Sequence, residues 1–285
     1  MKKWLAIASI FTLVGTTSCK QPAQSGNSQD TNIASGDTLT GDISLSGAFA
    51  LYPMVVRWAD EFKKLCDANS MKIVSTHSSI QEDKNKEEEI MNRWRELFKI
   101  QKACGGKYFV IPSYGVDYTV QGLKDMCNYF NKVGKIAQEY GLTLGYHNHS
   151  NEFQKLKDSD DVMWEYLVEH TDPQYVCFEL DVYWCAKGGK DPVEYLKKYP
   201  KRIQLLHIKD DFVIGEGTVV NFENVFNQFY KNKMKDFFVE IEIPQSLRDK
   251  TNADGSKYNN DQIMEEMFKA AEKSMQYLKN AKFVK

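Results

Sequence analysis

Apolar positions along the chain follow two alternating patterns, one typical of strands and one typical of helices. Short apolar runs that suit buried strands occur at residues 42–45, 72–77, 108–112, 143–147, 176–181, 203–207 and 237–242. Longer segments with apolar residues three or four positions apart lie at 52–69, 84–103, 121–140, 161–170, 192–199, 222–231 and 261–278. Met126, Phe130, Val133 and Ile136 show this helical spacing. The alternation predicts a parallel sheet covered by helices.

The spacing of the strands narrows the choice of fold. Successive strand ends lie about 26 to 35 residues apart, and a strand–helix–strand unit takes roughly 30 residues or more. No glycine-rich dinucleotide fingerprint follows the first strand, which disfavours a doubly wound sheet. We therefore expect an α/β fold of the (β/α)8 TIM-barrel type. Such a barrel has eight strands, and only seven are predicted, so the N-terminal end of the barrel is expected to be incomplete or altered.

Composition excludes several classes of protein. The chain has 285 residues, of which 42% are hydrophobic and 27% charged, with a formal net charge of −2. These values are ordinary for a globular protein and rule out a disordered, collagen-like or coiled-coil chain. No basic stripe is visible, so a nucleic acid is not an expected partner. The six cysteines include no C-x-x-C pair, which removes the usual zinc-finger and redox motifs.

The first 40 residues have the features of an export signal and a tether. Residues 1–18 combine two lysines, an apolar run of about eleven residues and a series of small residues, as in a signal peptide. The run is too short to span a membrane. Cys19 follows the small residues as in a bacterial lipoprotein, so we expect an exported, periplasmic or lipid-anchored protein. A plain signal peptide with an incidental cysteine is the alternative. Residues 19–40 are polar and predict a flexible tether.

Candidate metal ligands fall at the ends of consecutive predicted strands. In a barrel, alternate strand residues point inward, and the chemistry takes place at the C-terminal ends of the strands. Four strands each deliver one such residue to the same rim: His147, Asp181, His207 and Glu240. Imidazole and carboxylate ligands suit a divalent ion such as Mn²⁺, Co²⁺, Zn²⁺ or Fe²⁺. Any one histidine alone could be structural, but the repeated position at strand ends favours a ligand set.

Other polar residues near this rim are candidates for catalysis and substrate binding. A bound ion would polarise a carbonyl and its neighbouring hydroxyl, which eases proton loss from the adjacent carbon. Glu240 or Glu152 is the candidate base for this proton. Lys209 or His149 is the candidate donor to the developing oxyanion. The candidate substrate-binding residues are His77, Asn148 and Trp184. Glu179 faces inward on the same strand as Asp181 and receives no role.

Residues 62–285 resemble the sugar phosphate isomerase/epimerase family, whose fold is a xylose-isomerase-like barrel. The segments that carry the resemblance are FKKLCDANSMKIVSTH, GGKYFVIPSY, YHNHSNEF, ELDVYW, LLHIKD, GEGTVVNF and FFVEIE. The resemblance implies a divalent metal held by Glu, Asp, His and Glu on the last four strands. Asp181, His207 and Glu240 match three of these positions, and His147 takes the first. Glu152, five residues later, is the candidate for the missing carboxylate.

The resemblance implies an isomerase or epimerase that acts on a small carbohydrate. Trp184 stands where many members of the family have histidine, which implies a different substrate pocket. Some exported relatives look like lyases that act on keto-sugars by β-elimination, so a lyase is a second possibility.

Residues 41–61 differ from the family's first strands. They resemble the start of periplasmic phosphate-binding proteins, in which a turn leads into a helix, and they predict a fusion. Two other functions therefore stay open. One is a sugar- or phosphate-binding lipoprotein without activity, with residues 46–48 as an anion cradle. The other is a truncated barrel without stable function.

Overall fold

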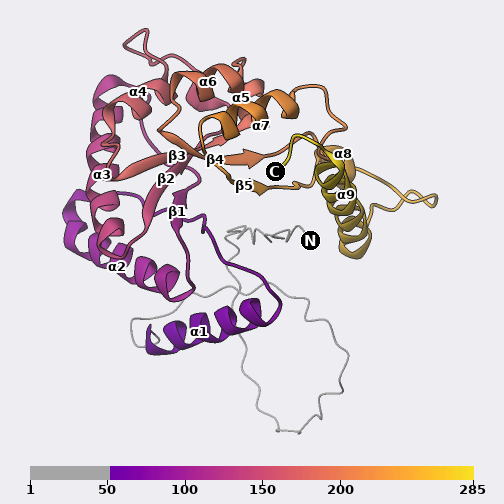
Figure 1. The fold of residues 1–285 in the computed structure, drawn as a ribbon, viewed down its shortest axis with the longest axis horizontal. Helices are drawn as coiled ribbons and strands as arrows, with labels where there is room; N and C mark the ends of the chain where they lie inside the picture. Colours follow the sequence, from indigo (N-terminus) through magenta and orange to yellow (C-terminus); the bar gives the residue numbers. More distant parts are fainter. Residues whose placement is uncertain (1–51) are drawn as a thin grey trace, which may run out of the picture.

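The computed structural model describes residues 52–285, which form a curled parallel sheet with helices around its outer face (Figure 1). The helices and strands are α1 (Tyr52–Ala68), α2 (Glu87–Ala103), β1 (Tyr108–Ile111), α3 (Val120–Glu139), β2 (Thr143–His147), α4 (Met163–His170), β3 (Val176–Asp181), α5 (Val182–Lys187), α6 (Pro192–Lys198), β4 (Ile203–Ile208), α7 (Phe222–Lys231), β5 (Asp236–Val239), α8 (Gln245–Arg248) and α9 (Asn260–Asn280). Two short 3₁₀ turns, η2 (Lys84–Lys86) and η3 (Asn151–Phe153), complete the elements of this part of the chain.

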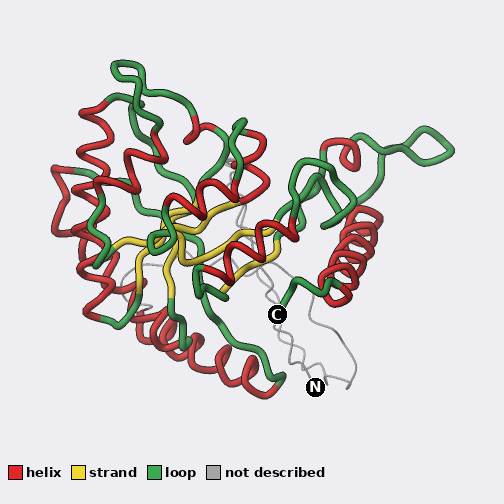
Figure 2. The backbone as a smooth tube through the Cα atoms, turned by 45° about the horizontal axis from the view of Figure 1, so that its top comes forward, coloured by secondary structure: helices red, strands yellow, loops and turns green. Residues whose placement is uncertain are grey.

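The sheet follows the order of the sequence, β1-β2-β3-β4-β5, and every neighbouring pair is parallel. Parallel neighbours require crossover connections, and α3, α4 to α6, and α7 supply them. In Figure 2 the strands gather at the centre and the helices lie outside them. This arrangement is part of a TIM-type barrel, so the predicted α/β barrel class is confirmed.

The number of strands differs from the prediction of seven, because residues 52–285 form five. The predicted strand 42–45 lies outside the described residues. Segment 72–77 was predicted as a strand but makes only one isolated parallel bridge, between His77 and Val110. It still follows β1, since Tyr108 N donates to Val74 O and Val110 N donates to Thr76 O. The backbone of this segment thus lies beside β1 without forming a regular strand.

The end of the last strand and two short helices also differ from the prediction. The last strand ends at Val239 and not at Glu242, although Glu240 N still donates to Ile208 O over 3.0 Å. The short helices α5 and α8 were not predicted, because one or two turns carry too little periodicity to be recognised. Helix α5 follows β3 at once, and its cap is Asp181, whose Oδ1 accepts from Trp184 N.

The two faces of the sheet bury different apolar sets. The inner face packs a small cluster contributed by β1, β3, β4 and β5: Tyr108, Val110, Cys177, Leu205 and Phe238. The alternate residues of β1, β2, β3 and β4 point outward and join the main core between sheet and helices: Phe109, Ile111, Leu144, Tyr146, Phe178, Leu180, Leu206 and Ile208. Strand alternation therefore places apolar side chains on both faces below the rim, and leaves the polar ones at the strand ends.

Residues 1–51 lie outside the described part, and with them the predicted signal peptide, tether, Cys19 and the first half of segment 41–61. Export and lipidation therefore stay predictions. Among residues 52–285, no helix combines the length and apolarity needed to cross a bilayer.

The first and last strands are joined at the end of the barrel opposite the rim. Asp236 at the start of β5 accepts from Lys107 Nζ over 2.8 Å and from the hydroxyl of Tyr108 over 3.1 Å. Tyr108 is buried in the inner cluster. This contact holds β1 near β5, although five strands alone do not close a barrel.

We predict that Asp236→Ala lowers the free energy of unfolding by about 1–2 kcal/mol, because it leaves the buried Tyr108 hydroxyl without its acceptor. Urea denaturation of the full chain measures this change. The control is Asp125→Ala, which removes an exposed ion pair with Lys84 and should cost less than about 0.5 kcal/mol. Equal effects of the two substitutions would contradict the closing role of Asp236.

Candidate active site

Polar side chains at the carboxyl ends of the strands surround one small pocket. Its cavity volume is about 130 Å³. The residues that line it come from segment 72–77, β2, α5, β4 and the chain after β1, β2 and β5: His77, Pro112, His147, His149, Trp184, His207, Glu240 and Glu242. This is the rim at which the sequence predicts the chemistry.

Asp181, His207 and Glu240 form a group that suits a divalent ion. One ligand atom from each lies within 4.8 Å of the others, and 3.3 Å separates His207 Nε2 from Glu240 Oε2. Within the described residues, Asp181 Oδ2 and His207 Nε2 are buried and have no hydrogen-bond partner. Buried polar atoms are rarely left unpaired. Two buried ligand atoms without a hydrogen bond, beside the carboxylate of Glu240, are what a divalent cation would satisfy, so these residues fit the metal that the sequence predicts.

The charges of this group follow from burial and from its neighbours. Burial raises the pKa of Asp181 to about 7. Burial alone would lower the pKa of His207, but the carboxylates of Glu179 and Glu240 more than offset it and raise that pKa to about 10. For Glu240, burial is outweighed by His207 and Lys209, which lower its pKa to about 2. Without an ion, His207 therefore supplies the positive charge that these carboxylates need.

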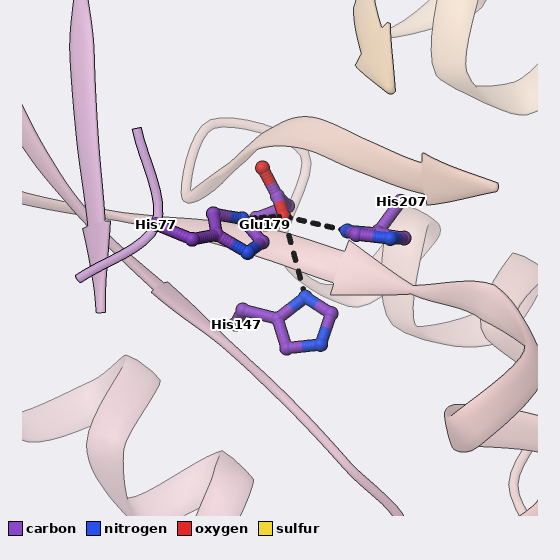
Figure 3. Close-up of side chains that lie close together, drawn as sticks. All are labelled: His77, His147, Glu179 and His207. Atoms are coloured by element: carbon purple, nitrogen blue, oxygen red, sulfur yellow. Dashed lines mark hydrogen bonds and ion pairs between the residues drawn. The ribbon is translucent and has the colours of Figure 1, made fainter. Parts of the chain in front are cut away.

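Glu179 is the residue of this site that the sequence analysis missed. It lies on β3 with no exposed surface, and its Oε1 atom meets a ring nitrogen from each of three histidines (Figure 3). The partners are His77 Nε2 at 2.8 Å, His147 Nδ1 at 3.2 Å and His207 Nδ1 at 2.9 Å. The strand pattern already placed Glu179 inward beside Asp181. A carboxylate inside a barrel needs buried partners, and that requirement is the signal that could have found its role.

The remaining predicted residues divide into two sets. His149, Glu240, His77 and Trp184 line the pocket. Lys209, Glu152 and Asn148 are buried and do not belong to that lining.

Lys209 lies behind the pocket wall, where it serves two carboxylates. Its Nζ donates to Glu240 Oε2 over 3.2 Å and pairs with Glu242. Nζ also lies 5.7 Å from the centre of the Trp184 ring. Lys209 therefore holds Glu240 and Glu242 in this structure, and its role as a donor to an oxyanion stays a prediction.

Glu152 and Asn148 shape the turn after β2. Both oxygens of Glu152 accept hydrogen bonds, from the Tyr146 hydroxyl and from His149 N, each over 2.9 Å. Asn148 exchanges two hydrogen bonds with the backbone of Asp181, at 3.0 and 3.1 Å. Glu152 therefore fixes the backbone of His149, and Asn148 fixes that of Asp181. Their predicted contact with the substrate or its proton stays a prediction.

The two histidines of the YHNH segment are held in their neutral form. Burial lowers the pKa of His147 to about 3, even though Glu179 opposes this shift. Burial also lowers the pKa of His149 from its ordinary value. His149 lines the pocket with a neutral ring at pH 7, so it can accept a proton there.

Comparison with known proteins agrees with this fold. The family model described as xylose isomerase-like TIM barrel matches residues 42–280. The match takes in nearly all of segment 41–61, whose likeness to a phosphate-binding protein stays a prediction. A sugar phosphate isomerase/epimerase from Parabacteroides distasonis ATCC 8503 has a similar structure, with a TM-score of 0.68, 32% identity, and coverage of 80% of this chain and 77% of that one.

Two further relatives are more distant or match over a shorter length. An inosose dehydratase of Clostridium tetani is 33% identical over 93 residues, which are 33% of this chain and 30% of that protein. The chain thus aligns with less than a third of the length of this curated relative. The IOLI protein, solved with a bound zinc atom, shares the fold at a TM-score of 0.54 and 16% identity, with coverage of 79% of this chain and 85% of that one. The extent of the family match and the likeness to the Parabacteroides structure show that the chain belongs to the xylose isomerase-like TIM barrel family.

Proposed function

We propose that the protein is a metal-dependent enzyme that removes a proton next to the carbonyl of a small polyhydroxylated ketone. Reprotonation of the resulting enolate gives isomerisation or epimerisation, and loss of a β-substituent from it gives elimination. The observation that carries this proposal is the group of Asp181, His207 and Glu240, in which two buried ligand atoms beside the pocket make no hydrogen bond. These three residues would hold the ion. The ion supplies a Lewis acid for the carbonyl and its neighbouring hydroxyl.

His149 is the group of the chain that would take the proton. It lines the pocket, and burial keeps its imidazole neutral at pH 7. Glu152 accepts from the backbone N–H of His149 and so fixes the turn that carries the ring. A positioned base of this kind contributes about 10²–10⁴-fold to the rate.

The other walls of the pocket suit a compact sugar. Trp184 offers an apolar ring, and Glu242 offers a carboxylate that Lys209 holds in place. A cavity of about 130 Å³ is smaller than the sites of about 300 Å³ or more that bind drug-sized ligands. A pocket of this size suits a monosaccharide or a cyclic polyol ketone better than a large conjugate.

The relatives support the same type of reaction. The names sugar phosphate isomerase/epimerase and inosose dehydratase both describe reactions of polyhydroxylated substrates. Proton removal next to a carbonyl is a step that serves both. This chain would carry out that shared step. Isomerisation or elimination would then follow according to whether the substrate carries a leaving group at the β-carbon.

We predict that the protein exchanges the α-hydrogen of a keto-sugar or an inosose with solvent deuterium. Exchange is common to isomerases, epimerases and lyases, so it does not depend on the final product. NMR of the substrate in D₂O, with Zn²⁺ or Mn²⁺ supplied, measures it. Asp181→Asn and His149→Ala should each slow exchange by about 10²-fold or more.

The matched control for His149 is His170→Ala, since His170 is an exposed histidine at the end of α4 that stacks on Tyr166. Its exchange rate should stay within about twofold of the unaltered protein. Exchange that survives chelation of the metal, or that is equally fast in His149→Ala, would contradict the proposed roles.

We predict that metal binding weakens as the pH falls from 8 to 6. Asp181, with a pKa of about 7, gains a proton over this range, and His207, with a pKa of about 10, already holds one throughout. A metal ion must displace these protons. Each proton therefore lowers the metal affinity about tenfold for every unit by which the pH falls, over the range in which that proton is bound. The dependence should therefore be steeper below pH 7 than above it.

Isothermal titration with Zn²⁺ in two buffers of different ionisation enthalpy measures both the affinity and the number of protons released. An affinity that stays constant from pH 6 to pH 8, with no proton release, would contradict the assignment of Asp181 and His207 as ligands.

A further inference from the structure

Glu179 is placed to act on the candidate metal site without lying in the pocket. It is fully buried, and its three histidine partners come from segment 72–77, β2 and β4. Figure 3 shows the three contacts converging on one carboxylate oxygen. The other oxygen, Oε2, has no hydrogen-bond partner within the described residues. One carboxylate therefore sets the orientation of three rings.

The contacts of Glu179 also fix which nitrogen of each ring carries a proton. An ionised carboxylate only accepts, so a ring nitrogen that faces it must be the N–H donor. His147 and His207 both turn Nδ1 toward Glu179. The opposite nitrogens face away from Glu179, with His207 Nε2 3.3 Å from Glu240 Oε2 and His147 Nε2 4.0 Å from Asp181 Oδ2.

We propose that Glu179 is a positioning residue that holds the Nδ1 protons of His147 and His207, so that both rings turn Nε2 toward Asp181 and Glu240. This inference rests on the metal-dependent function proposed above. A ligand histidine commonly donates its second N–H to a carboxylate, which fixes the ring and strengthens the ligand. Here the carboxylate of Glu179 accepts from the rings of both His147 and His207, since β2 and β4, which carry them, both pair with β3.

Glu179 also ties His77 to the sheet. His77 presents its opposite nitrogen, Nε2, to the same oxygen, and its segment has only one bridge to β1. The ring centres of the three histidines lie 4.7 to 5.6 Å apart. A pocket wall with so little regular pairing of its own depends on this side-chain contact.

A test on the metal-free full chain uses ¹⁵N NMR of its histidine rings. The expected result is a proton on Nδ1 of both His147 and His207, and a proton on Nε2 of His77. Addition of Zn²⁺ should shift the ¹⁵N resonance of Nε2 of His207 and leave the proton on Nδ1 in place. A proton on Nε2 with a bare Nδ1 in His147, or loss of the Nδ1 proton of His207 when Zn²⁺ binds, would overturn the proposal.

Substitutions separate this role from simple stability. Glu179→Leu removes the acceptor and should weaken Zn²⁺ binding about 10- to 100-fold, with the ring proton of His147 no longer held on Nδ1 and free to move to Nε2. Glu179→Gln keeps an acceptor oxygen and should restore the Nδ1 proton and most of the affinity. The control Glu152→Gln alters another buried carboxylate, which does not contact either ring, and should leave both readouts unchanged.

The outcomes distinguish the two proposals. If the unaltered chain binds no divalent ion, the proposed function fails, while the NMR result still decides the role of Glu179. If it binds one ion and Glu179→Leu binds it within about threefold of the same affinity, the positioning role is wrong. Two bound ions, one of them lost in Glu179→Leu, would make Glu179 a ligand and would also overturn the proposal.

Discussion

The site depends on one buried carboxylate in contact with three imidazoles. Glu179 has no exposed surface, and burial alone would raise its pKa, but the electrostatic attraction of His77 and the hydrogen bonds from His147, His207 and His77 hold that pKa well below its ordinary value. A buried charge is tolerated only when its partners are close and well oriented. The rings that satisfy Glu179 are thereby fixed, and two of them turn their second nitrogen toward Asp181 and Glu240.

The alternation of strand residues links the sequence to this site. Because every second residue of a parallel strand faces the barrel interior, the sequence alone brought His147, Asp181, His207 and Glu240 to one rim. The structure places ligand atoms of the last three within 4.8 Å of one another, and His147 Nε2 lies 4.0 Å from Asp181 Oδ2. The same argument predicted that His149 lies near the rim, and the resemblance to the family pointed to Trp184; both line the pocket.

Other features could not be predicted from the sequence, because strand parity says which face a residue takes and not what it touches. Lys209 has the correct parity, yet its ammonium group is taken up by Glu240 and Glu242. Asn148 and Glu152 lie in the YHNHSNEF segment that carries the family resemblance, but their polar atoms bind the backbone of Asp181 and of His149. Segment 72–77 has a strand-like sequence, and whether it forms a regular ladder depends on neighbours that local sequence does not reveal.

We propose that Asp181, His207 and Glu240 hold one divalent ion while Glu179 supports the histidine rings from behind. Anomalous X-ray diffraction from crystals of the full chain grown with Zn²⁺ would locate this ion. We expect one anomalous peak in contact with Asp181 Oδ2 and His207 Nε2, with Glu179 still hydrogen-bonded to Nδ1 of His207. A peak bound by Glu179 and the histidines alone, or no peak at this rim, would contradict it.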